Sequence, residues 1–208
     1  MNERRRLREA LGGFACVEVH APFAIELTNA NLSAGIAALA PVLALAADLG
    51  ADIVTVHAQL PDAAVAPANW LGPMHALDAQ AAASGLTVGL EIVAGFDTVI
   101  GWGLPRIGVT LDVGHMHVQE AGRQSLASLG GLGGVIRHLG STLRHLHLHD
   151  VCDGVDHCEV GTGSTGFAEI GVALKQIDYR GGLCLELNPD RVSPEGIRRS
   201  RAYLAHRF

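Results

Sequence analysis

The sequence predicts an α/β fold in which parallel strands form a (β/α) barrel, and three features support this prediction. Short apolar runs alternate with segments of helical periodicity along most of the 208 residues. Several of these runs end on histidine, glutamate or aspartate, and their alternate residues are small or polar. The intervening residues are aliphatic, as a strand face packed against helices requires. A barrel, whose active site lies at the carboxyl ends of its strands, fits this pattern better than a doubly wound sheet does.

Six strands are expected, several of them rich in β-branched residues. In chain order they are 16–20, 52–57, 87–92, 107–112, 144–150 and 182–187. A single histidine or carboxylate at a strand end is more often a cap or a solvated residue than a ligand. Six such ends in succession are difficult to assign to chance. The potential ligands at these ends are His20, His57, Glu91, Asp112, His147 and Glu186.

Helices are predicted between most of the strands. Their expected ranges are 33–49, 68–84, 119–139 and 166–177, with a closing helix at 193–206. Ser33 and Ser193 are typical start signals, and Gly50 and Gly85 are typical stop signals. The apolar stretch 34–49 contains Pro41 and is short for a membrane span, so we expect a buried amphipathic helix there.

Composition restricts the domain organisation and the partners. The chain length and a hydrophobic content of 49% predict one domain over residues 1–208. A formal charge of −6, with Lys175 as the only lysine, does not favour nucleic acid as a partner. The basic start of the chain lacks the features of a targeting peptide, which predicts a cytoplasmic protein with no membrane association. The four cysteines are scattered, so we expect reduced thiols.

The chemistry of the strand ends predicts a catalytic metal centre. Carboxylates together with imidazoles suit Zn²⁺, Mn²⁺ or a related divalent ion. The minimal ligand set comes from four different strands, which predicts one bound ion with space left for substrate or water. These four ligands are Glu91, Asp112, His147 and Glu186. His145 is expected in an inner layer of the barrel, and His149 as a hydrogen-bonding partner of the ligands.

Two mechanisms fit these residues. In the first, Glu91 and Glu186 remove and return a proton on a sugar carbon whose neighbouring oxygen binds the metal. In the second, further ions, up to three in all, produce a hydroxide that attacks a phosphodiester. The number of histidines favours the second mechanism, and the scarcity of lysine favours the first. The residues that would bind the further ions are His20, His57, His115 and His157.

Several motifs resemble the xylose isomerase-like barrel superfamily, which includes endonuclease IV and the sugar phosphate isomerases and epimerases. The resemblance covers most of the chain and starts with "HAPFAIEL" (20–27), "VTVHAQ" (54–59) and "GLEIVAG" (89–95). It continues with "LDVGHMH" (111–117), "HLHD" (147–150), "DHCEVGTG" (156–163) and "LCLELNP" (183–189). Together these motifs are specific for the superfamily but much less so for one member.

The resemblance implies site residues. Glu91, Asp112, His147 and Glu186 match the metal ligands shared with the epimerases, and the four further histidines match the extra zinc positions of the endonuclease. The aspartate that the endonuclease places two residues before its loop histidine is Val155 here, with Asp156 or Asp153 as substitutes. The residues expected to contact substrate are His115, His149 and Asp150.

The resemblance begins at the third strand of the eight-stranded family pattern, so we expect an incomplete barrel. The interval from Glu91 to Asp112 also looks too short for a full crossover helix. An open sheet edge must be covered, which makes a homodimer plausible. The leading interpretation is a divalent-metal enzyme that isomerises or epimerises a small sugar or sugar phosphate. A phosphodiesterase that cuts abasic DNA is the main alternative, and a truncated barrel that binds ligand without turnover is the third.

Overall fold

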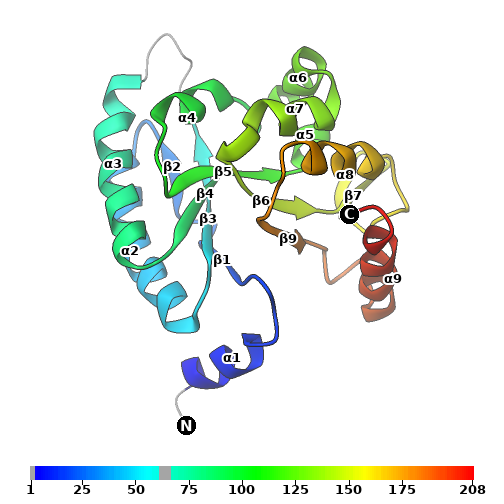
Figure 1. Cartoon of the computed structure of the whole chain (residues 1–208), viewed down its shortest axis with the longest axis horizontal. Helices are drawn as coiled ribbons and strands as arrows, with labels where there is room; N and C mark the ends of the chain where they lie inside the picture. Colours follow the sequence, from blue (N-terminus) through cyan, green and yellow to red (C-terminus); the bar gives the residue numbers. More distant parts are fainter. Residues whose placement is uncertain (1–2, 61–66) are drawn as a thin grey trace. The chain divides into compact units, whose positions relative to one another are not determined.

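The computed structural model describes residues 3–60 and 67–208 of the chain. The chain divides into two compact units, Met1–Thr110 and Leu111–Phe208. The boundary between them falls inside strand β5 (Ile107–Asp112). Figure 1 shows the first unit in blue to green and the second in green to red. The prediction of one domain over residues 1–208 stays a prediction.

The first unit is built on a parallel sheet. Its strands lie in the order β1-β3-β4-β5, and the short β2 also pairs with β3, on the same edge as β1. The bounds are β1 Glu18–His20, β2 Glu26–Thr28, β3 Ile53–Gln59 and β4 Thr87–Glu91. His57 pairs in register with Glu91, so these two side chains lie at the same end of neighbouring strands. The predicted strands of this half are thus confirmed, and β2 was not predicted.

Among the described residues of this unit, four helices accompany the sheet, and Figure 1 shows α2 and α3 side by side along it. Their bounds are α1 Glu3–Leu11, α2 Leu32–Leu49, α3 Pro67–Ala83 and α4 Phe96–Trp102. Helix α2 is long and apolar enough to cross a membrane by length and composition alone. It buries Ile36, Leu39 and Leu43 along one side, as the core helix of a globular unit does. The interval between β4 and β5 was expected to be too short for a full crossover helix, and the connection is made by α4, a helix of two turns.

Inside this sheet the β3, β4 and β5 residues form a polar inner layer. The hydroxyls of Thr55 and Thr110 are buried and lie 2.9 Å apart in a hydrogen bond. Gly89 lies between them, and a Cβ added to it would be 2.0 Å from Oγ1 of Thr110. The glycine is therefore required by the close approach of the threonine.

The second unit contains the end of β5, the parallel pair β6 (Leu143–Leu148) and β9 (Gly182–Leu185), and an antiparallel hairpin of β7 (Asp150–Cys152) and β8 (Val155–Cys158). Its helices are α5 His115–Val118, α6 Glu120–Leu129, α7 Gly131–Leu139, the 3₁₀ turn η1 Gly140–Thr142, α8 Phe167–Gln176 and α9 Pro194–Ala205. Helix α7 packs against α8, and α9 contacts β9.

One long helix over 119–139 was predicted here, and the structure has α5, α6 and α7 instead. Gly130 and Gly131 adopt φ of 78° and 84°, which breaks the helix between α6 and α7. Gln119 is extended and separates α5 from α6. Ser193, by contrast, caps α9 as predicted, since its side chain accepts a hydrogen bond from the backbone N–H of Gly196.

The β7–β8 hairpin was also not predicted, although its turn has a strong local signal. Asp153 and Gly154 join the two strands with φ of 51° and 79°, as a type I′ turn requires. The pairing then shifts by one residue, so that Cys158 and not His157 is opposite Asp150. His157 is the extra residue of this bulge and has a φ of 53°. The bulge sets the direction of the His157 side chain.

Candidate metal centre

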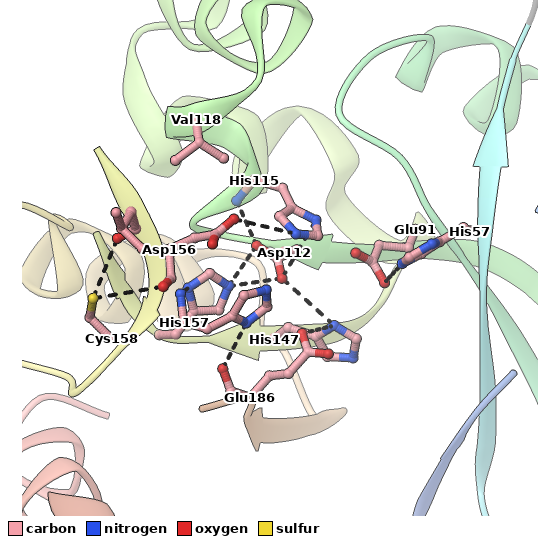
Figure 2. A network of polar contacts seen from close by, with 12 residues as sticks. His57, Glu91, Asp112, His115, Val118, His147, Asp156, His157, Cys158 and Glu186 are labelled. Atoms are coloured by element: carbon pink, nitrogen blue, oxygen red, sulfur yellow. Dashed lines mark hydrogen bonds and ion pairs between the residues drawn. The ribbon is translucent and has the colours of Figure 1, made fainter. Parts of the chain in front are cut away.

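Three of the four predicted metal ligands lie together in the second unit. Nδ1 of His147 is 2.9 Å from Oε2 of Glu186 and 3.9 Å from Oδ2 of Asp112. His147 and Asp112 are almost completely buried, whereas the side chain of Glu186 is 30% exposed. Figure 2 shows these side chains converging from the ends of β5 and β6 and from the residue after β9. One side of the cluster is therefore accessible from solvent.

The polar atoms of this cluster fit a divalent cation. Oε2 of Glu186 is shielded from solvent, and among the described residues it accepts no hydrogen bond of ordinary geometry. Nδ1 of His147 is nevertheless only 2.9 Å away. A carboxylate oxygen and an imidazole nitrogen that face each other in this way can both donate lone pairs to one ion. Two carboxylates and a histidine are the mixed oxygen and nitrogen donors that Zn²⁺ and Mn²⁺ accept.

His149 holds Asp112 in place. Its Nε2 is 2.9 Å from each oxygen of Asp112, and its Nδ1 is 2.8 Å from the backbone nitrogen of His157. Because a backbone N–H can only donate, Nδ1 accepts and Nε2 carries the proton that is donated to the carboxylate. His149 is fully buried, and neither ring nitrogen is left to bind a metal. It therefore orients Asp112, a candidate ligand, and is the hydrogen-bonding partner that the sequence suggested.

The ring of His149 occupies space that any side chain at position 114 would need. A Cβ on Gly114 would lie 2.0 Å from Cε1 and 2.5 Å from Nδ1 of His149. Gly114 belongs to the "LDVGHMH" motif and has an ordinary helical conformation, with a φ of −79°. Its role is thus clearance for the histidine, which the sequence analysis did not identify.

His157 is oriented so that one ring nitrogen can act as a ligand. Its Nδ1 lies 3.0 Å from the backbone carbonyl of Glu186, to which it donates a hydrogen bond. Nε2 then keeps its lone pair, which is the arrangement found for most metal-binding histidines. Asp112, His157 and Glu186 each have a possible ligand atom, and these atoms lie within 4.8 Å of one another.

His115 lies next to both Asp112 and His157, and its Nδ1 is 3.8 Å from Oδ2 of Asp112. Its ring is 5.4 Å from that of His157, and its Nε2 is 3.8 Å from Oδ2 of Asp156. The three residues His115, Asp156 and His157 form a second group with metal-binding spacing. Of the two substitutes considered for the missing endonuclease aspartate, Asp156 joins this group, whereas Asp153 is an exposed residue of the hairpin turn.

Asp150 anchors the loop that follows the hairpin. Its oxygens accept hydrogen bonds from the backbone N–H groups of Val151, Gly161 and Thr165 at 2.9–3.0 Å. Burial raises the pKa of this carboxyl, but the N–H groups, including that of Gly163, outweigh burial and hold the pKa below its ordinary value. The carboxylate is hydrogen-bonded to the backbone of the loop. Its role in substrate binding stays a prediction.

A separate cluster of predicted ligands lies in the first unit. Nε2 of His20 and Nε2 of His57 are 3.0 Å and 3.3 Å from the same oxygen, Oε2 of Glu91. Nδ1 of His20 is 2.8 Å from the backbone carbonyl of Ala21, so this nitrogen must donate. Nε2 of His20 and Oε2 of Glu91 therefore face each other, and both can donate a lone pair to one cation beside them. The exposed ring of Phe23 packs against both histidines.

The structure thus groups the predicted residues within each unit. His20, His57 and Glu91 meet in the first unit, and the second unit brings together Asp112, His115, His147, His157 and Glu186. His149 joins the second group through Asp112, and His145 is buried beside His147, with ring centroids 5.5 Å apart. The pairing of Glu91 with Glu186 stays a prediction.

Comparison with known proteins gives one relative of known activity. The chain is 30% identical over 131 residues to an L-ribulose 3-epimerase of Methylomonas sp. (strain DH-1). This match covers 57% of the chain but only 41% of the relative, so the chain spans less than half the length of that enzyme.

Solved structures share the fold at low sequence identity. The IOLI protein, solved with a zinc atom, has a TM-score of 0.73 at 15% identity, over 100% of this chain and 83% of that one. D-psicose 3-epimerase from Clostridium cellulolyticum H10, solved with D-tagatose, has a TM-score of 0.73 at 18% identity, over 99% and 83%. The incomplete coverage of these proteins agrees with the predicted incomplete barrel.

A protein-family model matches most of the chain. The model of the xylose isomerase-like TIM barrel matches residues 2–206, which confirms the fold class expected from the strand ends. The motifs that carry the resemblance, from "HAPFAIEL" to "LCLELNP", all lie within this range. The protein therefore belongs to the xylose isomerase-like TIM barrel family.

Proposed function

We propose that this protein is a divalent-metal-dependent enzyme that epimerises or isomerises a small keto sugar or sugar phosphate. The observation that carries the proposal is the cluster of Asp112, His147 and Glu186, in which two carboxylates and an imidazole converge with one open side. The relatives that are L-ribulose and D-psicose 3-epimerases support the same class of reaction and substrate.

Asp112, His147 and Glu186 would hold the cation, with Nε2 of His157 as a further donor. A bound Zn²⁺ or Mn²⁺ would polarise the carbonyl of a ketose and so acidify the neighbouring C–H group. His149 fixes the position of Asp112 through its hydrogen bonds of 2.9 Å. The carboxylate of Asp112 is therefore already oriented before substrate binds.

Glu186 is our candidate for the base that moves the proton. Its side chain is 30% exposed, whereas that of Asp112 is fully buried, so Glu186 is the carboxylate of this cluster that a substrate can reach. A positioned carboxylate typically accelerates such a proton transfer by about 10²–10⁴-fold. Epimerisation needs a second group that returns the proton on the other face, and we propose Glu91 for this role, as the glutamates at the strand ends led us to expect.

The test is solvent exchange at carbon. Metal-loaded protein is incubated with L-ribulose, D-tagatose or D-allulose in D₂O, and incorporation of one deuterium per turnover is followed by NMR. Glu186→Gln should lower the rate by about 10²-fold or more while it keeps the fold. Glu120→Gln, an exposed glutamate on α6, is the matched control and should be as active as the unchanged protein. Exchange that survives in Glu186→Gln would remove this residue from the mechanism.

A metal-dependent phosphodiesterase is the second candidate, and the cluster of His20, His57 and Glu91 favours it. Two imidazoles directed at one carboxylate oxygen offer a place for an additional ion, and His115 with Asp156 offers another. Elemental analysis of the purified protein separates the two candidates. About one ion per chain supports the epimerase, and close to three zinc ions support the phosphodiesterase, to be followed by an assay on abasic DNA.

A further inference from the structure

Helix α9 packs one of its faces against the loop that follows β8, and the proposed function does not use this contact. The face consists of Gly196, Arg199, Ser200 and Tyr203, whose spacings of three and four residues place them on the same side of the helix. They contact residues 159–161. This segment comes directly after β8, so its attachment determines where β8 ends.

Arg199 binds Glu159 with two hydrogen bonds. Its Nε and Nη2 donate to the two carboxylate oxygens at 2.6 Å and 2.7 Å, and such a double contact fixes the position of both side chains. The side chain of Glu159 is only 18% exposed and lies over Gly196, where an added Cβ would be 2.6 Å from Oε2 of the glutamate. The ion pair is therefore part of the packed contact between the loop and the helix.

The next two residues of the loop are attached through their backbone. The N–H of Val160 donates to Oγ of Ser200 at 3.0 Å, and both residues are buried. Gly161 lies against the ring of Tyr203, so close that an added Cβ would be 2.6 Å from the ring. Its N–H donates to Asp150 at 2.9 Å. Three consecutive residues are thus held on α9 by an ion pair, a buried hydrogen bond and a ring contact.

His157 and the residues after β9 hold each other through two hydrogen bonds. Nδ1 of His157 donates to the backbone carbonyl of Glu186 at 3.0 Å, and the carbonyl of His157 accepts from the backbone N–H of Asn188, also at 3.0 Å. The chain then continues from Asn188 to Ser193, the N-cap of α9. Both segments that carry these candidate ligands are thus attached to the same helix, one through residues 159–161 and the other through the chain itself.

We propose that Arg199 and Ser200 are positioning residues, which hold the loop on α9 and so keep His157 beside Glu186, where both can bind one cation. The inference rests on the proposed function for the identity of that bound group. Replacing a direct hydrogen-bonding partner of a metal ligand typically lowers metal affinity by about 10–100-fold. Arg199 acts on His157 only through the loop, so its replacement should have a smaller effect, about three- to tenfold.

The first experiment measures metal affinity, which does not depend on turnover. Co²⁺ is titrated into the metal-free full chain, and its visible absorption is followed. Arg199→Ala should raise the Kd for Co²⁺ by about three- to tenfold, and its Co²⁺ spectrum should shift toward that of His157→Ala. Arg198→Ala is the matched control, because this neighbouring arginine is 69% exposed and pairs with Glu195 of its own helix. Its Kd should stay within about twofold of that of the unchanged protein.

Two further variants separate positioning from a general loss of folding. Arg199→Lys keeps the charge but cannot make the double contact, so it should recover only part of the affinity. Ser200→Ala removes the acceptor of the Val160 N–H and should weaken Co²⁺ binding in the same direction. Equal Kd values for Arg199→Ala and Arg198→Ala, or a Co²⁺ spectrum of Arg199→Ala identical to that of the unchanged protein, would overturn the proposal.

The second experiment follows the loop without metal. Hydrogen exchange of the Asn188 amide, which donates to His157, should be at least about threefold faster in Arg199→Ala, while exchange in α8 stays the same. Arg198→Ala should exchange as the unchanged protein does. If the unchanged protein binds no Co²⁺, the proposed function fails, and this exchange alone decides the positioning role. An Asn188 amide that is protected equally in both variants would refute that role.

Discussion

Replacing Gly114 by alanine tests whether the position of His149 holds the second unit together. The added Cβ would lie 2.0 Å from Cε1 and 2.5 Å from Nδ1 of the His149 ring. Residue 114 has φ of −79° and ψ of −39°, a conformation that any amino acid adopts. Only the collision with the His149 ring should therefore lower stability.

The expected loss of stability combines two effects. Forcing an extra methyl group into a packed interior costs about 1–3 kcal/mol. The displaced ring also loses its buried hydrogen bonds to Asp112 and from the backbone N–H of His157. A hydrogen bond to a charged group contributes about 1.5–3 kcal/mol. Gly114→Ala should therefore lower the free energy of unfolding by about 3–5 kcal/mol.

The assay is urea denaturation of the metal-free protein, followed by circular dichroism. Gly101→Ala is the control, because Gly101 is an exposed helical glycine with no atom within 4 Å of the added Cβ. It should raise stability by about 0.5–1 kcal/mol.

A double-mutant cycle identifies the cause. In the His149→Ala background the methyl group has room, so Gly114→Ala should there cost less than about 1 kcal/mol. An equal cost with and without the histidine ring would refute the collision. A loss below about 1 kcal/mol in the unchanged background would refute the whole account.

Two further predictions concern buried polar groups. The pKa of Asp150 is lowered in the folded protein, so its ionised form stabilises the fold above the ordinary value of 3.8, and this contribution is lost as the pH falls below that value. Asp150→Asn should therefore cost about 2 kcal/mol or more near neutral pH in urea denaturation, with a smaller difference below about pH 4, and a difference independent of pH would contradict this. Thr110→Val should cost about 1–3 kcal/mol, because it leaves the buried hydroxyl of Thr55 without its 2.9 Å partner. Thr55→Val/Thr110→Val should recover part of that loss, and an additive loss would argue against the hydrogen bond.

The strands and the grouping of polar residues at their ends were predictable because they follow local patterns in the sequence. Alternation along a strand marks its two faces, and parallel strands bring their carboxyl ends to one edge, so His57 and Glu91 could be expected as neighbours. The fold class followed from the same strand ends.

Other features depend on contacts that a single sequence does not reveal. The role of Gly114 depends on a ring 35 residues away in the chain, and that of Gly89 on a threonine of the next strand. The break at Gly130 and Gly131 is different, because paired glycines are a local signal that the helical periodicity of 119–139 obscured. The Asp153-Gly154 turn was equally visible and predicts a hairpin.

The anchoring of Asp150 has a consequence for protein engineering. Its carboxylate is bound by backbone N–H groups, which every amino acid except proline supplies. Of the positions that donate, Gly161 and Gly163 are fixed. Gly161 has a φ of 88°, and a Cβ there would lie 2.6 Å from the ring of Tyr203, whereas a Cβ on Gly163 would lie 2.2 Å from the carbonyl oxygen of Val151. The exposed side chains between the anchor points can therefore be randomised without loss of the loop's path. Under the proposed function, a library over this loop would search for new substrate preferences while the backbone hydrogen bonds to Asp150 keep the loop attached.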